Sequence, residues 1–283
     1  MTGPTEWQIL GLGAFAGFTI FLGLLVALGR NLSRGARAFL SALAAGILLF
    51  LFFDVLNNAH EMVVAQIPAQ GGGNGSLALA YVVVLLVGWT AGFLSLGAFE
   101  KIYVKHTASK SQAAEETVEA AVEGRAPPPF TMDALTVSTM IAIGIGLHNF
   151  SEGLAIGTAY AGGALAAGTV LVIGFASHNA TEGFGILGPG LLSGKRYSPR
   201  RLISLGLVGG GPTFLGTVVG SLVYSSSLSI LFFGLAAGAI IYVVLEMVRP
   251  MMAPATKSWV WFGIVLGFIL GIATDTIVSF GGA

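Results

Sequence analysis

The chain has 283 residues, of which 55% are hydrophobic and only 9% are charged, and its formal net charge at pH 7 is zero. Soluble domains average about 25% charged residues, so this composition excludes an ordinary water-soluble surface and favours lipid as the solvent. The neutral balance argues against a nucleic-acid partner. The absence of Cys excludes disulfides and thiolate metal sites.

Apolar windows long enough to cross a bilayer follow one another along the whole chain. They lie at 8–28, 38–58, 77–99, 134–160, 164–188, 202–223, 228–248 and 258–279. We therefore predict an all-α integral membrane protein with eight transmembrane helices in a single domain, residues 1–283. No basic residue precedes the first window, so we expect it to be a transmembrane helix and not a cleaved signal peptide.

All 13 Lys and Arg residues fall in four connecting segments. These are Arg30, Arg34 and Arg37; Lys101, Lys105, Lys110 and Arg125; Lys195, Arg196, Arg200 and Arg201; and Arg249 and Lys257. Because basic loops stay in the cytoplasm, both termini are expected outside. The cytoplasmic loop 101–131 is expected to be a solvated linker, with a short surface helix at 113–123 as the alternative.

One motif, His-Asn-x-x-Glu-Gly, occurs twice, at 148–153 and again thirty positions later at 178–183. Residues i and i+4 share a helix face, so each motif presents its His and Glu together, with the Asn close by. Both motifs are predicted at the same depth on antiparallel neighbours, so their donors can meet. The six donors are His148, Asn149, Glu152, His178, Asn179 and Glu182.

Such donors deep in a membrane are costly and by default mark a function. Two ionised glutamates balance one divalent cation, and His with carboxylate suits Zn²⁺, Fe²⁺, Mn²⁺ or Cd²⁺ better than Mg²⁺ or Ca²⁺. The alternative is that these side chains only form polar contacts between helices. Gly153 and Gly157 have the spacing that lets helix backbones approach closely.

A second group of polar residues lies at the outer ends of the predicted helices. We interpret this group as an entrance that concentrates cations, because the external loops carry no Lys or Arg. The alternative is an interfacial cap where the helices end. The auxiliary candidates are Asp54, Asn58, His60, Glu61 and Asp275.

The doubled motif, the eight predicted helices, the outward termini and the long cytoplasmic loop resemble the ZIP (Zrt/Irt-like) family of metal-ion transporters. The resemblance implies a 3+2+3 arrangement with an inverted repeat, and a metal path through the six motif donors. It also implies transport of divalent metal toward the cytoplasm, with zinc foremost and iron, manganese or cadmium as alternatives. The metal is then substrate, and no catalytic cofactor is expected.

The chain departs from the family pattern at two places. Ser151 and Thr181 stand where the family often has Pro, and each hydroxyl can bend its helix mildly. The segment 209–212, Gly-Gly-Gly-Pro, stands where many members have Glu-Pro and is expected to interrupt its helix. The missing carboxylate predicts one tightly bound ion per protomer.

These observations predict a transporter and not an enzyme, located in the plasma or inner membrane of a prokaryote. A homodimer is one candidate for its assembly. An intramembrane His/Glu metalloenzyme is the rival, since helical His and carboxylate ligands also build di-iron centres. A non-transporting metal sensor is the third alternative.

Overall fold

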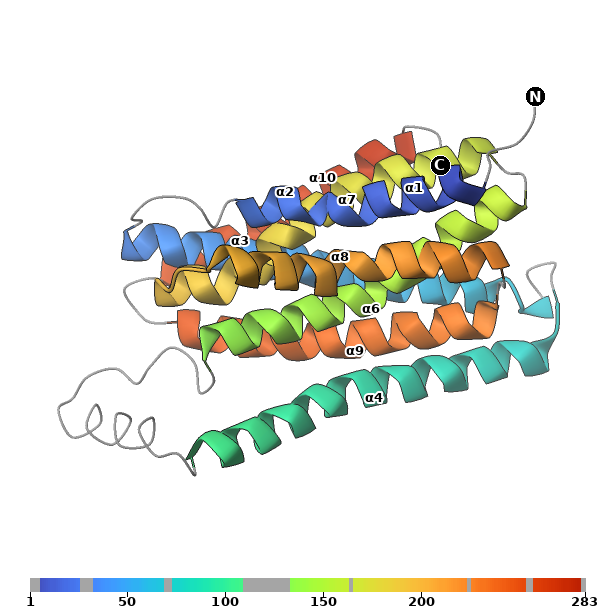
Figure 1. Cartoon of the computed structure of the whole chain (residues 1–283). Helices are drawn as coiled ribbons and strands as arrows, with labels where there is room; N and C mark the ends of the chain where they lie inside the picture. The colour runs from blue at the N-terminus through green and yellow to red at the C-terminus, as the bar shows by residue number, and fades with distance from the viewer. Residues whose placement is uncertain are drawn as a thin grey trace.

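The computed structural model describes residues 6–25, 33–68, 73–108, 133–162, 165–222, 225–252 and 257–280. Within these ranges every regular element is an α-helix, and the helices run roughly along one common axis (Figure 1). They are α1 Glu6–Phe18, α2 Ile20–Leu24, α3 Arg34–Val64, α4 Gly75–Ala108, α6 Ala134–Ala161, α7 Leu165–Ser193, α8 Pro199–Leu222, α9 Ser226–Met251 and α10 Lys257–Phe280. The prediction of an all-α membrane protein is confirmed.

Seven spans in the described ranges are long and apolar enough to cross a membrane. The predicted helix 164–188 corresponds to α7, which has the expected length but is not among the seven, so the number eight stays a prediction. The start predicted for loop 101–131 is wrong, because α4 continues to Ala108. The rest of that loop, including 113–123, lies outside the described residues.

Polar side chains fix several helix ends. Ser33 Oγ accepts a hydrogen bond from the Ala36 amide, and Asp133 Oδ2 accepts one from the Leu135 amide, so each caps the helix that follows. The first span is divided at Thr19, whose hydroxyl donates to the Ala16 carbonyl at 2.7 Å. The backbone is therefore locally irregular in the middle of the first span.

Glycines bring the motif helices against α8 and α2. A Cβ on Gly153 would overlap the Thr213 carbonyl of α8, and one on Gly183 would overlap the Ile20 carbonyl of α2. Gly157 likewise meets the Thr217 carbonyl. The Gly153–Gly157 spacing thus does bring backbones together, and the partner is α8.

The expected interruption of helix at 209–212 is wrong, because α8 is continuous through Pro212. Proline removes only one amide donor, and the helix persists because α8 packs closely against α1 and α6 on both sides of that residue. Gly210 and Gly17 lie so close that a Cβ on either one would overlap the carbonyl of the other.

The remaining four long helices form a second layer. α4 packs against α9, α10 packs against α3, and α3 packs against α9 (Figure 1). This layer contacts the motif helices at two places, where α3 packs against α7 and where α9 packs against α6. The outward faces of α4 and α10 carry exposed apolar side chains such as Leu86, Leu94, Trp261 and Phe262, which suits contact with lipid.

Candidate metal centre

The neighbouring helices α6 and α7 bring charged members of the two motifs together. His148 Nε2 lies 3.0 Å from Glu152 Oε1, one turn along α6, and 3.9 Å from Glu182 Oε1 of α7. The helical spacing of four residues therefore places His148 beside Glu152, and helix packing adds Glu182 from the second motif. His148 thus lies near one glutamate from each motif.

The site is dry. His148, Asn149, Glu152, Asn179 and Glu182 are all buried, with at most 3% of any of them exposed. The ring of Phe233 on α9 lies 6.5 Å from the His148 ring, centroid to centroid, and gives the site an apolar wall. Two acidic side chains in such surroundings are expensive unless a positive charge compensates them. The environment therefore favours a cation.

Each motif asparagine is held by a backbone carbonyl of a different helix. Asn149 Nδ2 donates to the Gly209 carbonyl of α8 at 3.0 Å, and Asn179 Nδ2 donates to the Ala16 carbonyl of α1 at 2.9 Å. Ala16 lies one turn before the irregularity at Thr19, and Gly209 lies one turn before Pro212. The two amide groups are thus fixed in orientation by equivalent contacts on opposite sides of the site.

Fixing the amide nitrogen also fixes the oxygen. The Oδ1 atoms of Asn149 and Asn179 are buried, and neither has a hydrogen-bond partner in the described part of the chain. An unsatisfied buried carbonyl costs about 1–3 kcal/mol, so native structures rarely keep one without a reason. A bound cation would supply the missing partner for both oxygens.

The fourth charged or imidazole member of the motifs, His178, lies on α7 directly before Asn179, and its side chain is outside the described part of the structure. The described His, Asp and Glu side chains do not by themselves form a group of three or more that could hold a metal. A complete coordination shell from the six predicted donors therefore stays a prediction.

The auxiliary candidates lie on other helices than the motifs, in the C-terminal parts of α3 and α10. Asn58 Nδ2 donates to the Asp54 carbonyl at 2.9 Å, a contact within α3. Glu61 accepts from Asn57 Nδ2, also within α3. His60 and Glu61 are exposed, while Asp275 on α10 is partly buried. Their role as an entrance stays a prediction.

Sequence reasoning did not anticipate the two carbonyls that hold the asparagines. Ala16 and Gly209 carry no polar side chain, and a backbone carbonyl leaves no mark in a sequence. Pro212 gave an indirect signal, because proline disturbs the hydrogen bonding of the preceding turn.

A family model described as ZIP Zinc transporter matches residues 100–278, which is more than half of the chain. The chain belongs to the ZIP family. The match includes both motifs and α6 to α9. No curated protein matches the sequence closely enough to count as a relative.

Family membership makes this ZIP protein a divalent-metal transporter of the membrane, with the metal ion as its substrate. ZIP proteins are transporters and not enzymes, which sets aside the intramembrane metalloenzyme. The seven apolar spans agree with an integral membrane protein.

Proposed function

We propose that this ZIP protein carries a divalent transition-metal ion, with zinc foremost, toward the cytoplasm through a site between α6 and α7. The proposed donors are His148, Asn149, Glu152, His178, Asn179 and Glu182. The observation that carries the proposal is the pair of buried Asn149 and Asn179 oxygens that lack a hydrogen-bond partner. They lie in the two motifs whose His148, Glu152 and Glu182 converge.

The donor chemistry favours zinc over lighter metals. Imidazole and carboxylate together suit Zn²⁺, with Fe²⁺, Mn²⁺ and Cd²⁺ as weaker alternatives, while Mg²⁺ and Ca²⁺ prefer oxygen ligands alone. The description of the matching family model names zinc as the transported metal. Two glutamates supply two negative charges, and Gly211 adds no carboxylate from α8. We therefore propose one tightly bound ion per protomer.

We also propose eight spans in a 3+2+3 arrangement, in which the first three and the last three form an inverted repeat. Reciprocal contacts support this. Gly23 of α2 faces Ala180, the third residue of the second motif, and Gly216 of α8 faces Phe150, the third residue of the first. The pairs Ala16 and Gly209, Gly17 and Gly210, and Gly23 and Gly216 all have the same separation along the chain.

The proposed topology places both termini outside. The start of α1 and the end of α10 lie at one end of the bundle, opposite to the end of α4, which carries Lys101 and Lys105, and to the start of α6 (Figure 1). Asp54, Asn58, His60, Glu61 and Asp275 then form the proposed entrance. A prokaryotic plasma or inner membrane and a homodimer stay predictions.

Zinc uptake into proteoliposomes tests the proposed function. The natural chain should take up zinc with saturation, while Glu152→Gln, which removes one buried charge and keeps the side-chain shape, should take up little. Glu246→Gln is the matched control, because Glu246 is a partly buried carboxylate of α9. Saturable zinc binding without uptake by the natural chain would contradict transport and favour the sensor.

A further inference from the structure

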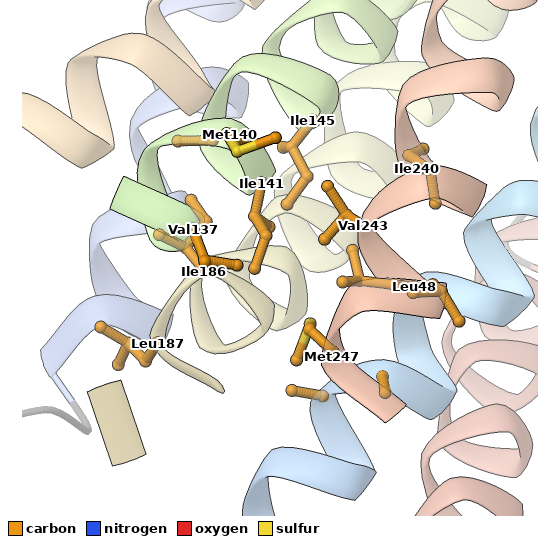
Figure 2. Close-up of a cluster of buried hydrophobic side chains, with 14 of the residues drawn as sticks. Leu48, Val137, Met140, Ile141, Ile145, Ile186, Leu187, Ile240, Val243 and Met247 are labelled. Carbon is orange, nitrogen blue, oxygen red and sulfur yellow. The ribbon is translucent and has the colours of Figure 1, made fainter. Parts of the chain in front are cut away.

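The space between the motifs and the cytoplasmic ends of α6 and α7 is closed by apolar side chains. Figure 2 shows this cluster, to which α6 contributes Ile141 and Ile145, α7 contributes Ile186 and Leu187, and the second layer contributes among others Val243. These five side chains are at most 2% exposed. An ion could pass from the site to the cytoplasm here only if the inner ends of α6 and α7 separate.

A buried tyrosine hydroxyl joins those inner ends. Tyr197 lies in the connection between α7 and α8, and its hydroxyl is 2.7 Å from Ser138 Oγ of α6. The same hydroxyl donates to the Leu187 carbonyl of α7 at 3.2 Å and accepts from the Gly190 amide at 3.0 Å. Tyr197 is 8% exposed and Ser138 is fully buried, so water does not replace these bonds readily.

The local sequence of α7 makes room for this contact. Pro189 within α7 lacks an amide donor and disturbs the preceding turn. A Cβ on Gly190 would overlap the Tyr197 ring, so the absence of a side chain lets the ring lie against the helix. Burial raises the pKa of Tyr197 to about 12, although the bonds with Ser138 and Gly190 lower it, so the hydroxyl keeps its proton at neutral pH.

Two further contacts tie the α7–α8 connection to the start of α6. Lys195 pairs with Asp133, the residue that caps α6. Arg201, in the first turn of α8, donates to the Leu135 carbonyl at 2.9 Å and to the Thr139 hydroxyl. Both pairs lie at the same end of α6 as Ser138. The inner end of α6 is thus held by three residues within seven positions of the chain.

We propose that Tyr197 with Ser138, Leu187 and Gly190 forms a latch that keeps the cytoplasmic exit closed beneath the apolar cluster. Opening requires the Tyr197 hydroxyl to leave Ser138 on α6 or Leu187 on α7. The inference rests on the proposed function for its meaning as an exit. The latch itself is a physical contact between two helices and can be tested without metal.

The test uses Ile141→Cys as a reporter in the chain, which has no native Cys. In lipid nanodiscs both membrane faces are open to a thiol reagent, so the labelling rate depends neither on the orientation nor on the direction of transport. Adding Tyr197→Phe should raise the rate about fivefold to tenfold, as expected when a buried hydrogen bond of ordinary strength no longer favours the closed state. The matched control is Tyr160→Phe, which removes a buried tyrosine hydroxyl bonded to Thr169 at the other end of α6.

The control should change the rate less than twofold. Equal labelling with and without Tyr197→Phe, or the same increase from Tyr160→Phe, would overturn the latch. If Tyr197→Phe does not fold, Ser138→Ala replaces it in the labelling test, because this variant removes one partner of the Tyr197 hydroxyl and leaves the tyrosine ring in place. An unchanged rate in that variant would also overturn the latch. A natural chain that moves no zinc would refute the proposed function and leave the labelling result intact.

Discussion

Replacing Glu182 by Gln removes one of the two buried negative charges and keeps the size of the side chain. Glu182 Oε1 lies 3.9 Å from His148 Nε2, so an ion bound by both lies within about 4 Å of this carboxylate, where each unit of its charge interacts with the carboxylate by about 4 kcal/mol at an effective dielectric constant of about 20. Loss of one partner from a buried charge pair costs about 3–5 kcal/mol. The zinc dissociation constant should therefore rise by about a hundredfold to a thousandfold.

Calorimetric titration of purified protein with zinc measures this change. Glu246→Gln is the control, since it removes a carboxylate from α9 and should leave zinc affinity within twofold. Size-exclusion chromatography and thermal unfolding establish that both variants are folded. If Glu182→Gln binds zinc as tightly as the natural chain, zinc affinity does not depend on this carboxylate and the charge argument is wrong.

The topology predicts that single Cys residues at three positions react with an impermeant thiol reagent from outside the cell: Gly73, Gly162 and Ser226. A Cys at Ser198 should not react, and the opposite pattern would reverse the map. Gly153→Ala should lower stability by about 1–3 kcal/mol through overlap with the backbone of α8, whereas Gly211→Ala, with nothing within 4 Å of its new Cβ, should not; equal thermal unfolding of the two would contradict the packing. Zinc affinity should fall as pH falls from neutral to mildly acidic, because a ligating imidazole must be neutral, and a flat pH profile would argue against His148 and His178 as ligands. The contribution of Tyr197 to thermal stability should be constant up to about pH 10 and should be lost as pH rises toward its folded-state pKa of about 12, since the buried phenol is stabilised in its neutral form; Tyr197→Phe should remove that part of the loss.

The contacts of the motif residues show what a sequence can specify. His148 and Glu152 share a helix face by periodicity alone, and their depth in an apolar stretch predicts burial, so both features could be anticipated. The meeting with Glu182 followed from equal depth on antiparallel neighbours. The shared helix face, the burial and the meeting with Glu182 can all be predicted from helix geometry and the thickness of the bilayer.

The choice of packing partners could not be anticipated in the same way. The Gly153 spacing predicts a close approach of some helix, but periodicity describes a face and not the neighbour that covers it, and the neighbour is α8. The bonds of Asn149 and Asn179 to backbone carbonyls depend on the register between helices that are distant in sequence. The contacts of Tyr197 depend on the path of the short connection between α7 and α8 and on Pro189 within α7, and hydrophobic patterning describes neither.

The proposed transport path requires the ion to bind between α6 and α7. Anomalous diffraction from crystals of the zinc-loaded protein, recorded at the zinc edge, tests it most directly. We expect one strong peak per protomer, within coordination distance of the Glu152 and Glu182 carboxylates and the Asn149 and Asn179 side-chain oxygens. A strong peak only in the C-terminal part of α3, beside Asp54 or Glu61, would contradict the proposed site.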